Sequence, residues 1–141
     1  MSVYAESSAV LAWLFGEPGA SAVTRILENS DAVIVSELTL LECERAVIRG
    51  LGLKELNRAE AERIRARLRE AAEIWNVWRF SREILQRAAQ PFPSEPLRTL
   101  DALHLAWALA VRSELPSVAI LSLDERIRNA ARPLGFQVYP G

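Results

Sequence analysis

Two short apolar runs constrain the fold of this chain more than any other feature. Ala32–Val35 and Val118–Ser122 are almost wholly apolar and rich in β-branched residues, and polar residues do not alternate with the apolar ones. This composition is typical of strands buried on both faces, as in a parallel sheet that helices cover on each side. The two runs therefore predict an α/β fold with a central parallel sheet.

Strand and helix patterns alternate through the rest of the chain. Three more strands are expected, at Ser2–Ala5, Val77–Phe80 and Phe136–Tyr139. Helices are expected at Ala9–Phe15, Ala20–Glu28, Ser36–Arg49, Glu55–Trp75, Arg82–Gln90, Leu97–Arg112 and from Asp124 to about Pro133. No linker or internal repeat interrupts this order, so residues 1–141 are predicted to form a single domain. The predicted architecture is a three-layer α/β/α domain around a mostly parallel sheet of about four or five strands.

The composition favours a globular cytoplasmic protein. Half of the 141 residues are hydrophobic, and the net charge of −1 supplies no overall basic surface for nucleic acid. Lys54 is the only lysine among 17 basic residues. Arginine suits phosphate and RNA binding, although codon bias in a GC-rich genome explains most of these arginines. The single cysteine, Cys43, suits a reducing cytoplasm.

Neither a membrane span nor a signal peptide is expected. No apolar run reaches the roughly 18–20 residues that cross a bilayer. The early apolar run Ala9–Phe15 has no positive charge before it, as a signal peptide would require.

A carboxylate near the start of an apolar helix is the first candidate functional group. Leu100, Leu103, Trp107 and Ala110 recur at helical spacing, which predicts that their face is core. Asp101 lies among them, and a carboxylate there costs free energy unless it is capped, paired or bound to a metal. The alternative is that Asp101 is an ordinary acid in the first helical turn, stabilised by the helix dipole.

Three further acids are expected at the same edge of the sheet. Glu6 follows the first strand, Asp124 follows the strand at Val118–Ser122, and Glu42 lies early in a helix, as Asp101 does. Ligands bind beyond the carboxyl ends of parallel strands, where these acids converge. Clustered carboxylates repel one another, and a divalent cation removes that conflict. Oxygen ligands select Mg²⁺ or Mn²⁺ over zinc.

Two of these acids also have simple surface interpretations. Glu42 would pair with Arg45 or Arg49 one turn or two along the same helix. Glu6 would be a solvent-exposed charge at the end of an edge strand.

Local interpretations also exist for Asp124 and His104. Asp124 would serve only as a helix N-cap, and Ser122 and Glu125 match the spacing of a capping box. His104 invites comparison with a hydrolytic triad, but the chain has no strand–turn–helix nucleophile elbow. A lone histidine on an apolar helix is more typical of a buried core residue, and a position beside the Asp101 site stays open.

Four segments together resemble one known family. They are Val3–Ala9, the pattern Ser36-x-x-Thr39-x-x-Glu42, the block Leu97–Ala106, and Leu121 to Gly135 with Ser122 and Asp124. In this order they closely resemble a PIN domain, and more narrowly the VapC-type toxins of toxin–antitoxin pairs. The resemblance covers essentially the whole chain. The chain departs from the pattern at Glu6, where the family usually has aspartate.

The resemblance implies a metal-dependent endoribonuclease. Glu6, Glu42, Asp101 and Asp124 would hold one or two Mg²⁺ or Mn²⁺ ions, and a carboxylate would orient the attacking water. Ser8 and Ser122 would hydrogen-bond a ligand carboxylate or a metal-bound water, and Arg98 would contact phosphate. The implied partners are an RNA substrate, such as tRNA or rRNA, a VapB-like antitoxin and a second copy of the chain.

The glutamate at position 6 leaves a second hypothesis open. Its extra methylene moves the carboxylate by about 1.5 Å, and Mg²⁺ requires near-ideal octahedral geometry. The protein would then be a catalytically weakened PIN-fold module that binds RNA or antitoxin without efficient cleavage. A small-molecule α/β enzyme is disfavoured because the chain has no glycine-rich phosphate loop.

Overall fold

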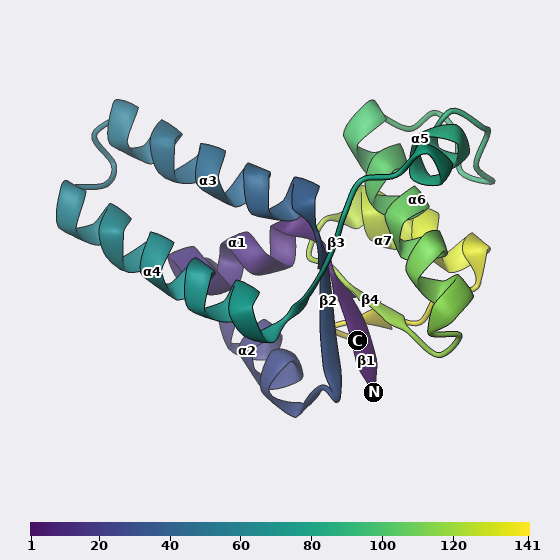
Figure 1. Ribbon diagram of the computed structural model, residues 1–141, viewed down its shortest axis with the longest axis horizontal. Helices are drawn as coiled ribbons and strands as arrows, with labels where there is room; N and C mark the ends of the chain where they lie inside the picture. Colours follow the sequence, from purple (N-terminus) through teal and green to yellow (C-terminus); the bar gives the residue numbers. More distant parts are fainter.

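A five-stranded parallel sheet forms the centre of the computed structural model, which describes residues 1–141 (Figure 1). The strands are β1 (Ser2–Ala5), β2 (Ala32–Ser36), β3 (Asn76–Trp78), β4 (Ala119–Leu121) and β5 (Val138–Tyr139), in the spatial order β3-β2-β1-β4-β5. All four neighbouring pairs are parallel. The predicted parallel sheet is thus confirmed.

Helices cover both faces of this sheet (Figure 1). One face carries α1 (Ser7–Phe15), α2 (Ala20–Asn29), α3 (Glu37–Gly52) and α4 (Arg58–Ile74). The other face carries α5 (Arg82–Ala88), α6 (Thr99–Glu114) and α7 (Glu125–Ala131), after which a short 3₁₀ turn spans Arg132–Leu134. The three-layer α/β/α architecture is therefore as predicted.

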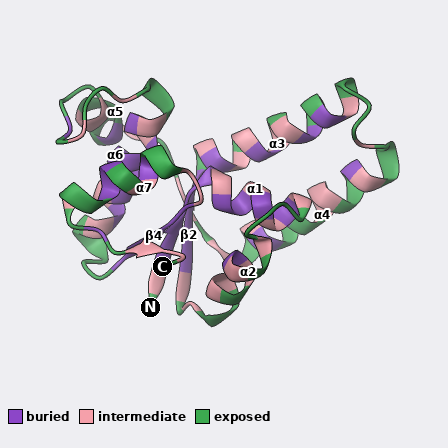
Figure 2. Ribbon diagram, turned by 180° about the vertical axis from the view of Figure 1, so that it is seen from behind, coloured by how far each residue is buried: buried purple, intermediate pink, exposed green.

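Each face of the sheet has its own hydrophobic core, because neighbouring strand residues point to opposite sides. Val3 and Ala5 of β1 belong to the core beneath α1–α4, whereas Tyr4 belongs to the core beneath α5–α7. Figure 2 shows the strands and the inner helix faces buried, with the exposed residues on the outside. The apolar runs that predicted doubly covered strands are buried on both sides.

Several helix boundaries lie two or three residues from their predictions, and the end of α3 has a clear structural cause. The sequence predicts that Gly50 and Gly52 end the third helix near Arg49, but α3 continues to Gly52. A Cβ at Gly50 would lie 2.7 Å from Leu56 Cδ1, so this glycine lets the returning chain pack against the helix. Gly50 is therefore a close-packing residue within α3 and not its stop signal.

The predicted core face of α6 is partly wrong. Leu100 is 48% exposed, and Leu103 and Ala110 are only half-buried. Ala102, Leu105, Ala106, Trp107, Ala108 and Val111 form the buried side. The helix is enclosed by the sheet, α5 and α7, so its buried side is wider than one stripe and is centred away from Leu100.

None of the helices combines the length and the apolar character that a membrane crossing requires.

Candidate active site

The carboxyl ends of β1 and β4 place two of the predicted acids side by side. Glu6 follows β1 directly, and Asp124 lies three residues after the end of β4, its neighbour in the sheet. A backbone hydrogen bond of 2.9 Å from Glu6 N to Leu121 O joins the two strand ends. The sheet topology therefore brings the positions of these two residues to neighbouring strand ends.

Glu6 is buried and anchored by two serines. Its Oε2 accepts hydrogen bonds from Ser8 N at 3.1 Å, Ser8 Oγ at 2.5 Å and Ser122 Oγ at 2.7 Å. Only 4% of the residue is exposed, so the interpretation of Glu6 as a surface charge is wrong. Ser8 Oγ also accepts from Leu123 N and Asp124 N, which ties the start of α1 to the loop after β4.

Glu42 is held by residues from two other elements. Its Oε1 accepts hydrogen bonds from Ser7 Oγ at 2.8 Å and from His104 Nε2 at 2.7 Å. Partial burial would raise the pKa of Glu42, but these bonds from His104 and Ser7 outweigh it and hold the pKa below its ordinary value. The expected surface pairs with Arg45 or Arg49 do not form.

His104 is the partner of Glu42 that the sequence did not identify. It is 3% exposed, as expected for a core histidine, and its Nδ1 lies 3.2 Å from the Tyr4 hydroxyl. Burial raises the pKa of Tyr4 well above its usual range, so the phenol keeps its proton and donates to Nδ1. Nε2 then carries the imidazole proton and donates to Glu42. The position of His104 one turn after Asp101 was the only feature of the sequence that pointed to the site. Its contact with Glu42 depends on how α3 and α6 pack, which the sequence pattern does not give.

Asp124 caps α7, as its local interpretation predicts. Its Oδ1 accepts from Arg126 N at 2.8 Å and from Ile127 N at 3.4 Å. The predicted capping box with Ser122 and Glu125 is wrong, because Ser122 Oγ donates to Glu6 and accepts from Asp124 N. A reciprocal box occurs instead at the start of α4, between Asn57 and Glu60.

Asp101 has no hydrogen-bond partner for its buried oxygen. It lies in the first turn of α6, and its Oδ2 is shielded from solvent and accepts no hydrogen bond. A buried, unpartnered acceptor costs about 1–3 kcal/mol, and more when it is charged. Such an atom in a folded protein calls for a ligand or a functional explanation.

Each of the four acids keeps at least one carboxylate oxygen that accepts no hydrogen bond, and such an oxygen is free to bind a metal. Glu6, Glu42 and Asp124 are each held through a single oxygen, which leaves Glu6 Oε1, Glu42 Oε2 and Asp124 Oδ2 without a hydrogen bond from the chain. Asp101 is held through neither oxygen. Carboxylate oxygens of this kind, including the unpartnered Asp101 Oδ2, are the ligand type that a hard divalent cation prefers. As the side chains stand, however, no three His, Cys, Asp or Glu residues form a group that could hold a metal ion.

Comparison with known proteins assigns the family. The sequence model of the PIN domain matches residues 3–133. The chain belongs to the PIN-domain family. It is 32% identical over 137 residues to ribonuclease VapC46 of Mycobacterium tuberculosis, with 97% of this chain and 95% of the relative covered. The chain is thus a PIN-domain protein of the VapC type.

Solved structures of two PIN-domain proteins share its fold. The crystal structure of Mycobacterium tuberculosis VapC20, a sarcin-ricin loop cleaving toxin, has a TM-score of 0.68 at 14% identity and covers 96% of both chains. The structure of VapBC2 from Rickettsia felis, bound to a DNA fragment from their promoter, has a TM-score of 0.67 at 10% identity. It covers 98% of this chain and 97% of that one.

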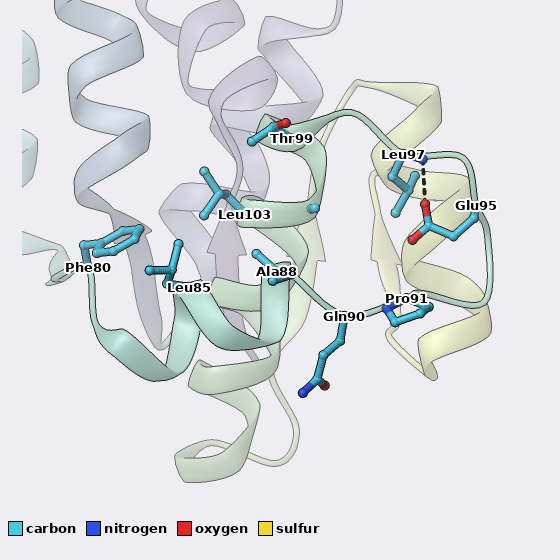
Figure 3. Close-up of a pocket in the computed structure, with 11 residues that line it drawn as sticks. Phe80, Leu85, Ala88, Gln90, Pro91, Glu95, Leu97, Thr99 and Leu103 are labelled. Carbon is cyan, nitrogen blue, oxygen red and sulfur yellow. Dashed lines mark hydrogen bonds between the residues drawn. The ribbon is translucent and has the colours of Figure 1, made fainter.

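Two pockets of this PIN domain differ in character. A pocket of about 560 Å³ between α5 and α6 is lined mainly by apolar residues, and its single carboxylate, Glu95, accepts from Leu97 N (Figure 3). None of the four predicted acids lines it. A second pocket of about 450 Å³ is lined by Asp101 and by the predicted phosphate contact Arg98. The polar pocket, not the larger apolar one, therefore adjoins the candidate site.

Proposed function

We propose that this protein is an endoribonuclease that hydrolyses phosphodiester bonds of RNA with the help of Mg²⁺ or Mn²⁺. The observation that carries the proposal is the set of carboxylate oxygens left without partners at one edge of the sheet. Glu6, Glu42, Asp101 and Asp124 would hold the cation. The name of the relative VapC46, a ribonuclease, supports RNA as the substrate class.

The surrounding polar residues would orient these ligands. Ser8 and Ser122 hold one oxygen of Glu6, and His104 and Ser7 hold one oxygen of Glu42. Such partners fix the direction of a ligand carboxylate and raise its effectiveness. When bound, the divalent cation would lower the pKa of its water and neutralise charge on the scissile phosphate.

The chain's own groups would bind and orient the reactants. The free oxygen of Glu6 or Asp124 would orient the attacking water or accept its proton. Arg98, exposed directly before α6, would contact an RNA phosphate. The proposed substrates are structured RNAs such as tRNA or rRNA, and the proposed location is the cytoplasm.

We also propose two protein partners, a VapB-like antitoxin and a second copy of the chain. The similarity to VapBC2 of Rickettsia felis motivates the antitoxin. Exposed apolar side chains on the α3–α4 hairpin, which extends away from the sheet in Figure 1, support protein contacts there. They are Leu41, Ile48, Leu53 and Ile74. Light scattering of the purified protein, with and without antitoxin, measures both associations.

The second candidate is a PIN-fold module that binds RNA or antitoxin without efficient cleavage. Two observations favour it. Glu6 Oε2 is already committed to three hydrogen bonds, and the acids do not stand as a ready-made metal cluster. Glu6→Asp separates the two candidates, since it restores the length of the acid that the family usually carries.

The test combines cleavage with metal binding. Pooled tRNA and structured RNA are incubated with Mg²⁺ or Mn²⁺ and the wild type, Asp101→Asn, Glu6→Asp or the control Glu44→Gln, whose acid pairs with Arg65 outside the site. Mn²⁺ affinity is measured by calorimetry on the same proteins. We expect metal-dependent cleavage by the wild type and Glu44→Gln, and none by Asp101→Asn.

Other outcomes point elsewhere. Cleavage by Glu6→Asp alone would establish the natural protein as a binding module. Failure of every variant to bind Mn²⁺ would overturn the four-acid site.

A further inference from the structure

We propose that the pocket beside Asp101 binds a single RNA phosphate next to the one that is cleaved, through Arg98 and Arg126 together. The pocket of about 450 Å³ is bounded by the loop before α6, the first turn of α6 and one side of α7. Its polar lining consists of Ser94, Arg98, Asp101, Arg126 and Asn129. The inference rests on the proposed nuclease function and adds a subsite to it.

Both arginine side chains are available to a ligand. Arg98 and Arg126 are exposed, and neither guanidinium makes an ion pair or a hydrogen bond within the chain. Some other arginines do have partners in the chain, as Arg65 has in Glu44 and Arg128 has in Ser122 O and Pro140 O. The pocket thus gathers two guanidinium groups that the fold itself does not use.

Asn129 adds a third hydrogen-bond donor to the lining of this pocket. Asn129 Oδ1 accepts a hydrogen bond from Arg132 Nη1 at 3.0 Å, which leaves the Asn129 amide NH₂ without an acceptor. The unused groups of the lining are therefore mainly donors. Two guanidinium charges exceed the one Asp101 carboxylate, so the pocket favours an anion with several acceptor oxygens, as a phosphodiester has.

The remaining wall suits a nucleotide better than a free ion. Pro96, Leu97 and Ala130 contribute apolar surface, and the volume lies within the range of about 300–1,000 Å³ typical of small-ligand sites. The phosphate would meet the arginines while the attached sugar or base covers the apolar wall. Because Asp101 belongs both to this pocket and to the four acids, the bound nucleotide would be continuous with the RNA at the cleavage site.

If Arg98 and Arg126 bind the same phosphate, the salt dependence of RNA affinity will show it. The logarithm of the binding constant for single-stranded RNA falls with the logarithm of salt concentration by about 0.7 per neutralised phosphate. Either guanidinium alone still neutralises a shared phosphate. Arg98→Gln and Arg126→Gln should therefore keep most of the salt slope, and the double variant should lower it by about 0.7 in total.

The experiment measures fluorescence anisotropy of a short labelled single-stranded RNA in EDTA, so that cleavage plays no part. We expect each single variant to weaken binding about threefold to tenfold at low salt. The double variant should weaken it by more than the product of the two, because only the double variant leaves the phosphate without a neutralising charge. Arg25→Gln is the matched control, because Arg25 is an exposed arginine of α2, near the amino end of β2. It should bind as the wild type does.

Three results would overturn the inference. A double variant that binds like Arg25→Gln would show that the pocket does not hold RNA. Slopes that fall by about 0.7 for each arginine would show two separate phosphates. Absence of any RNA binding by the wild type at low salt would overturn the proposed nuclease function as well, which distinguishes it from the first two results.

Discussion

Glu6 and Asp101 lie at the same edge of the sheet, in opposite surroundings. The serine-lined corner around Glu6 gives its Oε2 three donors, whereas the first turn of α6 gives Asp101 Oδ2 none. A hydrogen bond to a charged group is worth about 1.5–3 kcal/mol, and an unsatisfied buried group costs a similar amount. The hydrogen bonds of Glu6 therefore stabilise the fold, whereas the buried oxygen of Asp101 costs stability unless a ligand binds it.

The contrast assigns Glu6 a structural role that Asp101 lacks, although both are carboxylates at the same edge of the sheet. Glu6 joins α1 to the loop after β4, because the hydroxyls of Ser8 and Ser122 both donate hydrogen bonds to its carboxylate. Asp101 has no comparable structural role beyond its favourable position near the helix N-terminus, worth about 0.3–1 kcal/mol. Active-site residues often reduce stability in this way, and their replacement then stabilises the protein.

Asp101→Asn should produce the largest functional effect with no loss of stability. We expect RNA cleavage to fall at least a hundredfold, which exceeds the typical effect of losing a residue that only orients a ligand. The free energy of unfolding in urea should stay within about 0.5 kcal/mol of the wild type or rise by about 1 kcal/mol, because a charged orphan is removed.

Glu114→Gln is the control for this prediction, since Glu114 is an exposed acid at the other end of α6. It should change neither quantity. A loss of more than 1 kcal/mol in Asp101→Asn would mean that Asp101 has a structural partner after all.

Glu6→Ala should produce the largest loss of stability. The substitution removes the acceptor of three hydrogen bonds, one of which caps α1, so we expect a cost of about 3 kcal/mol. Urea unfolding measures it, with Glu17→Ala as the control because Glu17 is exposed. A cost below 1 kcal/mol would contradict the structural role assigned to Glu6.

The sequence predicted the elements because burial patterns are local. The apolar strands follow directly from the composition of their runs, and the structure buries them in the core. The prediction that the four acids lie at one edge of the sheet rests on where parallel strands end. This inference needed only the order of strands and helices, not side-chain packing.

The contacts of the candidate site could not be predicted in the same way. His104 and Glu42 are 62 positions apart, and they meet only because α3 and α6 flank the end of β1. Ser122 matched a local capping box, but its hydroxyl is used by Glu6, 116 positions away. Competition between a local and a distant partner depends on tertiary packing, which the spacing of residues does not record.

His104→Gln extends the comparison to the second anchored acid, since His104 supports Glu42 as the serines support Glu6. Glutamine keeps a donor of similar reach but loses the bond to Tyr4. We expect cleavage to fall about 10-fold to 100-fold, with a loss of about 1–2 kcal/mol in unfolding free energy. Unchanged cleavage at reduced stability would limit His104 to a structural role.

The smallest expected effect concerns the pH dependence of stability at Glu42. Its pKa is lowered in the folded protein from the ordinary value of 4.5, with the bonds from His104 and Ser7 outweighing burial. The ionised carboxylate therefore stabilises the fold fully above about pH 4.5, and this contribution is lost as the pH falls through the folded pKa.

Glu42→Gln removes the titrating group. Urea unfolding from pH 7 downward should thus give a constant deficit for Glu42→Gln relative to the wild type until about pH 4.5, then a shrinking one. A deficit that grows toward acid pH would mean that burial, rather than His104 and Ser7, dominates at Glu42, and the likeness between Glu42 and Glu6 as anchored acids would fail.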